Sequence, residues 1–189
     1  SQKEPSILEI MKYNPSLLSF SGDKLLGSVQ AGIIIGKKEL IEKIKKNQLL
    51  RMLRVDKITL SILEDTLNSY LKNELHDIPT LNMLFATLET LEQKANSLFE
   101  KIKDICKCEI IKTQTLIGGG TTPNKKIPSI ALCIKNETYK PNQLEKLFRK
   151  NNLIARIENE KLLLDFRTIQ ENEIEKIAVI IKKIFQRAN

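Results

Sequence analysis

The sequence predicts an α/β protein, and three observations support this class. Short runs of β-branched and apolar residues, such as 17–20 and 32–35, are typical of strands. Longer segments that follow them, such as 57–75, carry apolar residues at helical spacing. Of the 189 residues, 41% are hydrophobic, which is enough to form a buried core in one or two domains.

Residues 1–77 form the first predicted domain, in which strands precede helices. Polar and glycine residues separate its apolar runs and mark the turns between elements. In chain order we expect a short helix (7–12), a strand (17–20), a turn around Lys24, a strand (32–35) and two helices (37–46 and 57–75).

Residues 78–105 are expected to form one long helix that connects two domains. Pro79 suits the first turn of a helix, and the segment from Thr80 to Ile105 contains no Gly or Pro that would interrupt it. Apolar residues at helical spacing mark one face of this segment.

Residues 106–189 form the second predicted domain, a small α/β unit. We expect a mainly antiparallel sheet with helices on one face, because apolar runs of strand length return here. Its strands are expected at 109–115, 129–135, 154–158 and 162–166, and its helices at 141–150 and 172–186. Gly118, Gly119 and Gly120 lie in a predicted loop from Ile117 to Lys126, which lacks the spacing of a phosphate-binding P-loop.

Composition excludes several classes of protein. The apolar runs are too short to cross a membrane, and no secretory signal is visible, so the sequence predicts a cytoplasmic protein. The three cysteines lack zinc-site spacing and are odd in number, which argues against a disulfide framework. The net charge of +8 favours a polyanionic partner, although many lysines alternate with glutamates on solvated helix faces.

Lys24 is the most informative residue. An apolar run delivers this lysine into a turn of serine and glycine, with Gly22 before it and Gly27 after it. A lysine that forms a Schiff base with pyridoxal phosphate (PLP) must be held near a sheet edge beside small residues, so that the flat cofactor can approach. A surface lysine in an ordinary turn is the alternative interpretation of the isolated motif.

The residues around Lys24 and several later segments resemble bacterial selenocysteine synthase, the L-seryl-tRNA(Sec) selenium transferase family. The matching segments occur in the same order across essentially the whole chain: Ser19–Gly27, Gln30–Ile34, Gly36–Glu39, Leu50–Lys57, Ile78–Leu81 and Arg156–Ile157. The likeness is to the C-terminal part of that family only. One departure is Gly27-Ser28-Val29-Gln30, where the family has Gly-Gly-Pro-Gln, so we expect a less constrained turn here.

The resemblance implies a fold-type I, aspartate-aminotransferase-like PLP-dependent transferase. Residues 1–77 would then be the end of its PLP-binding large domain. The implied reaction converts seryl-tRNA(Sec) to selenocysteinyl-tRNA(Sec) with selenophosphate, in a homo-oligomer that is a ring of dimers. The tRNA-binding domain and other cofactor contacts of the family would lie upstream, so we expect this 189-residue piece to be inactive alone.

The resemblance also implies the site residues. Lys24 would carry PLP and move protons, and Ser21 and Ser19 would donate hydrogen bonds to the cofactor phosphate, as serines before the lysine do in related PLP enzymes. Asp23 would tune the proton affinity of Lys24 or help to position a substrate group, although Gly-Asp is also a common turn pair. Arg51 and Arg54, if helical, would share one side and bind the selenophosphate anion, although a solvated pair is the alternative. Arg156 and Arg167 are weaker anion-binding candidates, for which structural ion pairing is an equal alternative.

Two other functions remain open from the sequence. One is a related PLP-dependent lyase or transferase acting on a small amino acid or amino sugar. The other is a non-catalytic basic module that binds RNA or a protein.

Overall fold

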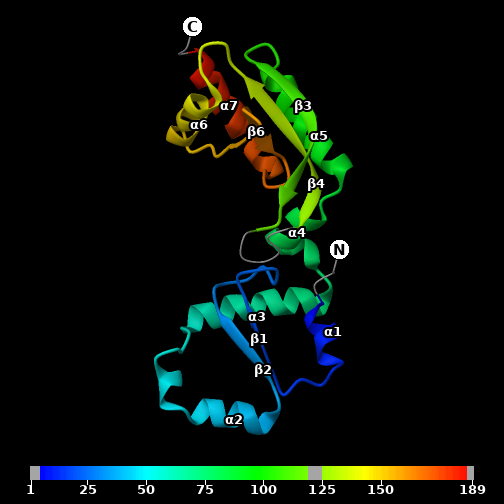
Figure 1. The fold of residues 1–189 in the computed structure, drawn as a ribbon, viewed down its shortest axis with the longest axis vertical. Coiled ribbons are helices and arrows are strands. Elements are labelled where there is room, and N and C mark those ends of the chain that lie inside the picture. The colour runs from blue at the N-terminus through cyan, green and yellow to red at the C-terminus, as the bar shows by residue number, and fades with distance from the viewer. Residues whose placement is uncertain (1–4, 119–124, 187–189) are drawn as a thin grey trace. The chain divides into compact units, whose positions relative to one another are not determined.

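The computed structural model describes residues 5–118 and 125–186 and divides the chain into two compact units, Ser1–Asn82 and Met83–Asn189. We call them unit 1 and unit 2. Both combine helices with antiparallel strands, so the predicted α/β class is confirmed (Figure 1). Most of the predicted glycine-rich loop lies outside the described residues.

Unit 1 contains a two-stranded antiparallel sheet and three helices. Its strands are β1 (Leu17–Ser21) and β2 (Gly32–Gly36), and Leu18 pairs with Ile35 in their register. Its helices are α1 (Ile7–Met11), α2 (Lys38–Lys46) and α3 (Lys57–Lys72), and the short 3₁₀ turns are η1 (Gln48–Arg51) and η2 (Leu75–Asp77). These bounds lie close to those expected from the sequence.

The ends of α3 show why its boundaries fall where they do. The Asp56 carboxylate accepts hydrogen bonds from the backbone N–H groups of Ile58 and Thr59, at 2.8 and 2.9 Å, and so caps the first turn. Asn73 ends the helix in the left-handed conformation at φ 60°. The helix therefore stops before Leu75, where the sequence had predicted its end.

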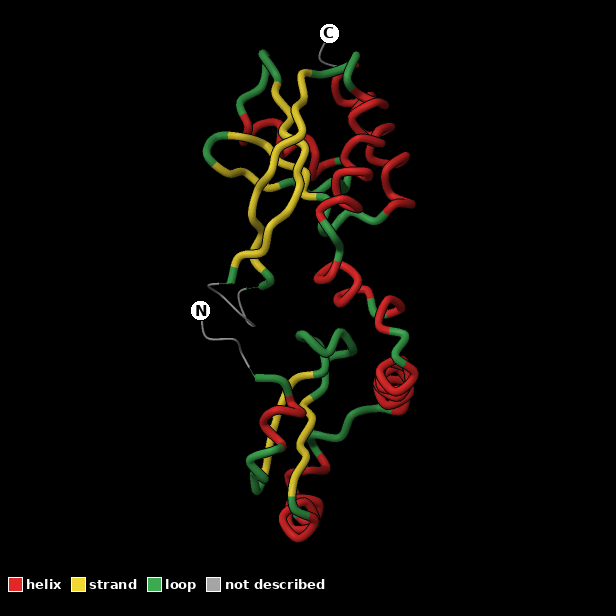
Figure 2. The backbone as a smooth tube through the Cα atoms, turned by 90° about the vertical axis from the view of Figure 1, so that its right-hand side faces the viewer, coloured by secondary structure: helices red, strands yellow, loops and turns green. Residues whose placement is uncertain are grey.

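Unit 2 contains a four-stranded antiparallel sheet in the order β3-β4-β6-β5. The strands are β3 (Lys107–Leu116), β4 (Lys126–Lys135), β5 (Arg156–Glu158) and β6 (Lys161–Asp165). The helices α5 (Leu88–Ile102), α6 (Pro141–Lys150) and α7 (Ile174–Gln186), with the 3₁₀ turn η3 (Glu171–Glu173), complete the unit. Its helices gather on one side of the sheet, as the sequence predicted (Figure 2).

The main core lies between this sheet and its helices. Leu91, Leu98 and Ile102 of α5 are fully buried there, together with Leu132 of β4 and Phe148 of α6. In the described part of unit 1, by contrast, Ile78 and Leu81 are the only buried hydrophobic side chains. Unit 2 thus has a complete core of its own, whereas unit 1 leaves much apolar surface exposed.

The prediction of one connecting helix at 78–105 is wrong. Two helices occupy this segment, α4 (Pro79–Phe85) and α5, and α5 packs into the core of unit 2. The Arg167 guanidinium donates to the backbone carbonyls of Met83, Leu84 and Ala86, which are therefore not free to extend α4. Thr87 then caps α5 by accepting from Thr90 N at 3.2 Å.

Candidate functional site

The turn that carries Lys24 follows directly from β1 and is closed by backbone hydrogen bonds. Gly22 N donates to Ala31 O at 2.8 Å, and Gly27 N donates to Lys24 O at 2.9 Å. Ser28 N donates to Gly22 O at 2.8 Å. The backbone on both sides of Lys24 is thus fixed.

Two glycines in this turn occupy places that no larger residue fits. A Cβ atom at Gly22 would lie 2.5 Å from the carbonyl oxygen of Val29. Gly27 adopts φ +75°, and a Cβ there would lie 2.5 Å from the Ile78 side chain. The glycines that the sequence placed beside Lys24 are therefore required by the backbone of the turn.

Two side chains of α3, which were not predicted as site residues, form hydrogen bonds with the part of the turn that follows Lys24. Thr66 Oγ1 donates to Ser28 Oγ at 2.9 Å, and Tyr70 OH donates to the carbonyl oxygen of Leu26 at 3.1 Å. Partial burial raises the pKa of Tyr70, so its hydroxyl stays a donor well above neutral pH. The four-residue spacing of Thr66 and Tyr70 places them on one helix face and was the available signal.

Ser28 takes part in these contacts. Its backbone N–H and its hydroxyl are both hydrogen-bonded, and the hydroxyl connects the turn to α3. That Ser28-Val29 constrains the turn less than the family's Gly-Pro stays a prediction.

The four residues predicted to act around the cofactor come from β1 and the turn. Lys24 Nζ lies 3.8 Å from Asp23 Oδ2, and their side chains are 49% and 32% exposed. Ser19 and Ser21 are exposed and share one face of β1, because alternate residues of a strand point to the same side. The structure thus keeps a half-exposed amine, a carboxylate and two hydroxyls in one segment.

These residues fit the attachment point of PLP, which needs an accessible primary amine with small neighbours. Lys24 offers a half-exposed amine on a turn whose backbone is fixed at Gly22 and Gly27. Ser19 and Ser21, on the strand that leads into this turn, are exposed. The described residues of the turn contribute no aromatic ring that would stack on the cofactor.

Arg51 and Arg54 do not lie in one helix. The prediction that they share one side depended on a helix through both residues, and the structure has none there. Arg51 ends η1, which Asn47 caps, and Arg54 lies in the extended segment before Asp56. Both arginines are exposed. The helical turn ends at Met52, and α3 begins only after its N-cap Asp56, so no helix spans the two arginines.

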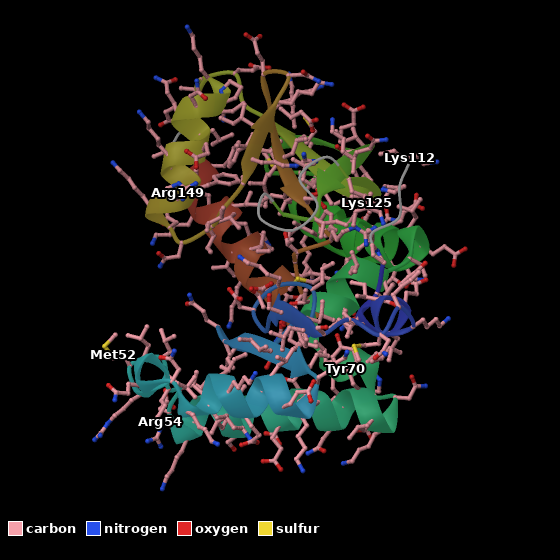
Figure 3. The ribbon with its side chains drawn as sticks, turned by 60° about the horizontal axis from the view of Figure 1, so that its bottom comes forward. Met52, Arg54, Tyr70, Lys112, Lys125 and Arg149 are labelled. Carbon is pink, nitrogen blue, oxygen red and sulfur yellow. The ribbon has the colours of Figure 1, made fainter. Side chains whose placement is uncertain are left out.

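The structure also separates Arg54 from the Lys24 turn within unit 1. Arg54 precedes the N-terminus of α3, whereas Tyr70, which contacts the turn, lies near its C-terminus (Figure 3). The helix has 16 residues, which corresponds to about 24 Å. One copy of the chain therefore does not bring Arg54 and Lys24 into a single site.

Arg156 of unit 2 is already paired with two carboxylates. Its Nη1 lies 3.0 Å from Glu158 Oε2, and its Nη2 lies 3.2 Å from Asp165 Oδ2 and donates to Thr113 Oγ1 at 2.9 Å. Ser129 Oγ donates to the other oxygen of Asp165 at 2.5 Å. With its charge compensated twice, Arg156 fits the structural alternative that the sequence left open.

Arg167 is buried and binds backbone carbonyls. Besides its contacts at the end of α4, its Nη2 donates to Pro128 O at 2.5 Å. Desolvation lowers the pKa of this guanidinium, although Asp165 partly opposes the shift. Its contacts likewise favour the structural alternative over anion binding.

Other candidate chemistry is limited in the described residues. No group of three or more His, Cys, Asp or Glu side chains in this part of the chain is placed to hold a metal. Burial raises the pKa of Cys106 to about 12, and burial also raises the pKa of Cys108 and Cys133, so none is an activated nucleophile. No described helix is long and apolar enough to cross a membrane.

Comparison with known proteins agrees with the sequence resemblance. Residues 1–170 match the family model described as SelA, L-seryl-tRNA selenium transferase. A relative from Aliarcobacter butzleri, named L-seryl-tRNA(Sec) selenium transferase, is 70% identical over 98% of this chain and 41% of its own length. One of the same name from Sulfurimonas denitrificans is 65% identical over 97% of this chain and 41% of its own length. The chain belongs to the L-seryl-tRNA selenium transferase family.

The chain spans about 41% of the length of these relatives, so the predicted C-terminal position stays a prediction. Solved structures give only a weak likeness. An ornithine aminotransferase from Plasmodium yoelii matches 95% of this chain and 44% of its own at 16% identity and a TM-score of 0.40. The ornithine δ-aminotransferase of Plasmodium falciparum matches 95% and 43% at 15% identity and a TM-score of 0.39. Scores this low carry no argument about function.

Proposed function

We propose that this chain supplies the PLP-binding lysine of a transferase that converts seryl-tRNA(Sec) to selenocysteinyl-tRNA(Sec). The observation that carries the proposal is the half-exposed Lys24 amine on a turn with two sterically required glycines. Membership of the L-seryl-tRNA selenium transferase family supports the choice of substrate. The activity belongs to a protein of the relatives' full length, in a homo-oligomer built from dimers.

Each residue of the turn has a defined task in this proposal. When bound, PLP supplies an electron-withdrawing ring that stabilises negative charge on the carbon beside the substrate's amino group. Lys24 holds the cofactor covalently, and its amine, once released, moves a proton to and from that carbon. Asp23, with a carboxylate oxygen 3.8 Å from the Lys24 amine, helps to position the amine or a substrate group. Ser19 and Ser21 donate hydrogen bonds to the phosphate.

Arg51 and Arg54 bind the selenophosphate anion in this proposal. Guanidinium groups suit such an oxyanion because they donate two parallel hydrogen bonds. Both arginines are exposed and precede the N-terminus of α3, whereas the Lys24 turn contacts the C-terminal part of this helix. In this proposal they therefore serve the cofactor of a second copy of the chain. In an assay with the full-length protein, Arg51→Ala and Arg54→Ala should raise the KM for selenophosphate more than the KM for seryl-tRNA(Sec).

The isolated chain should capture PLP but not complete the reaction. The described residues of its Lys24 turn offer the amine but include no aromatic side chain on which the cofactor ring could stack. Selenocysteinyl-tRNA formation should therefore be undetectable when the 189 residues are incubated with seryl-tRNA(Sec), PLP and selenophosphate. Formation of selenocysteinyl-tRNA by this chain alone would show that the prediction of an inactive piece is wrong.

Titration with PLP tests the proposal on the chain itself. The absorption band of the covalently bound cofactor should appear with the wild-type chain and be absent from Lys24→Ala. Lys37→Ala is the matched control, because Lys37 is also an exposed lysine of unit 1 next to a strand end. Equal bands from all three proteins would mean that PLP reacts with surface lysines, and the proposal would fail.

A further inference from the structure

Two series of hydrogen bonds run from α3 into the turn that carries Lys24. One starts at Tyr70 and the other at Thr66, which share one face of the helix. The first contacts span 44 residues, from Tyr70 to Leu26, and 38 residues, from Thr66 to Ser28. The turn and α3 lie side by side in the fold of unit 1 (Figure 1). We call the two series the Tyr70 link and the Thr66 link.

The Tyr70 link ends at Lys24 itself. Tyr70 OH donates to Leu26 O at 3.1 Å, and the next atom of the same peptide unit, Gly27 N, donates to Lys24 O at 2.9 Å. A peptide unit is planar, so a contact that holds its carbonyl oxygen also fixes the direction of its N–H. Tyr70 therefore orients the N–H group that binds the Lys24 carbonyl.

The Thr66 link ends at Gly22, on the other side of Lys24. The hydroxyls of Thr66 and Ser28 are hydrogen-bonded at 2.9 Å, and Ser28 N donates to Gly22 O at 2.8 Å. Thr66 Oγ1 also lies 3.0 Å from Ile62 O, which restrains its own rotation. The two links together thus hold the backbone before and after Lys24.

Gly27 explains why the turn needs the Tyr70 link. Glycine allows a wide range of backbone angles, so the Leu26–Gly27 peptide unit rotates more readily than one between two residues with side chains. Packing closes one side of Gly27, because a Cβ there would lie 2.5 Å from Ile78. On α3, the Tyr70 hydroxyl holds the carbonyl of the same peptide unit.

The Lys24 amine depends on this backbone for its direction. Its side chain is 49% exposed, and its ion pair with Asp23, at 3.8 Å, is too long for a hydrogen bond. A side chain that is held so loosely points where its backbone directs it.

We propose that Tyr70 and Thr66 are positioning residues for PLP capture, because they hold the backbone that presents the Lys24 amine to the cofactor. A group that is already oriented loses less freedom when it reacts. This inference rests on the proposed function, in which Lys24 carries PLP.

Titration of hydroxyl-deleted variants with PLP tests the inference. Tyr70→Phe and Thr66→Val each remove one hydroxyl and keep nearly the same side-chain volume. We expect the apparent dissociation constant for PLP at Lys24 to rise about fivefold in each, the ratio that corresponds to one ordinary hydrogen bond. Thr66→Ser, which keeps the hydroxyl, and Tyr13→Phe, at an exposed tyrosine of the same unit, are the controls and should match the wild-type chain.

Two further readouts separate positioning from general stability. Without PLP, hydrogen exchange at the Gly27 and Ser28 amides should be faster in Tyr70→Phe and Thr66→Val, whereas the amides of α2 should keep their rate. After borohydride reduction, the label on Lys24 should fall relative to the label on Lys37, an exposed lysine of the same unit. A loss of stability would instead speed exchange throughout unit 1.

The outcomes distinguish this inference from the proposed function. Equal capture at Lys24 by the wild-type chain, Tyr70→Phe and Thr66→Val contradicts only the inference. Faster exchange throughout unit 1, with an unchanged ratio of label on Lys24 to label on Lys37, also contradicts only the inference. Absence of label from Lys24 in the wild-type chain contradicts the proposed function, and the inference with it.

Discussion

At the scale of single residues, Gly27 is the most constrained position of the Lys24 turn. Its φ of +75° and the 2.5 Å approach to Ile78 both exclude a side chain. Gly27→Ala should therefore lower the free energy of unfolding by about 1–3 kcal/mol, measured by urea denaturation. Gly32→Ala is the control, because a Cβ there meets nothing within 4 Å. Equal costs at the two glycines would contradict this account of the turn.

Arg167 is the second residue whose replacement should be costly. Arg167→Met removes the donors that four backbone carbonyls now use, so we expect a loss of about 2–4 kcal/mol in the free energy of unfolding. Arg149→Met is the control: its exposed pair with Glu145 should contribute less than about 1 kcal/mol. If Arg167→Met lowers the free energy of unfolding no more than Arg149→Met does, the structural role of Arg167 is contradicted and anion binding becomes the better interpretation.

At the scale of elements, the Asp56 cap makes α3 sensitive to acid. Hydrogen bonds from Thr59, chiefly its backbone N–H, hold the pKa of Asp56 below its ordinary value of about 3.9. Because the folded-state pKa is depressed, this stabilisation is complete above the ordinary value and is lost as the pH falls through the folded-state pKa. Asp56→Asn keeps an acceptor that does not titrate.

Helix content measured by circular dichroism during an acid titration tests this cap. The difference between the wild-type chain and Asp56→Asn should be constant above about pH 5 and should shrink below about pH 4. If the difference in helix content between the two proteins does not change with pH, even below the folded-state pKa of Asp56, the carboxylate does not stabilise α3.

The elements also show what the sequence can and cannot predict. The periodicity of the apolar residues locates α2, α6 and both strands of unit 1 to within a residue or two. The break between α4 and α5 has one local signal, the N-cap residue Thr87, but Arg167 also binds the carbonyls at the end of α4 from far along the chain. Pattern reasoning fails where a distant side chain competes for backbone groups.

The candidate site follows the same rule. Lys24 and its glycines belong to one short segment and could be predicted. The spacing of Thr66 and Tyr70 places them on one helix face, but their contacts with the turn depend on how α3 packs, which the spacing does not reveal. The separation of Arg54 from Lys24 likewise depends on that packing, because the turn contacts the C-terminal part of α3 and Arg54 precedes its N-terminus.

At the scale of the whole molecule, the two units differ in how much apolar surface they bury. Met52, Leu53 and Leu71 of unit 1 are 77%, 73% and 84% exposed, whereas α5 of unit 2 has four buried residues. Local opening should therefore cost less in unit 1. In hydrogen exchange, amides of α2 should exchange faster than those of α5, although both are helical. Equal protection of α2 and α5 would contradict this asymmetry.

The central claim is that Lys24 is the residue prepared to hold PLP. The most direct measurement is borohydride reduction of the chain after incubation with a limiting amount of PLP, followed by mapping of the label by peptide mass spectrometry. The account predicts that the label is confined to the peptide containing Lys24 and disappears with Lys24→Ala. Label spread over several lysines, or absent from Lys24, would contradict it.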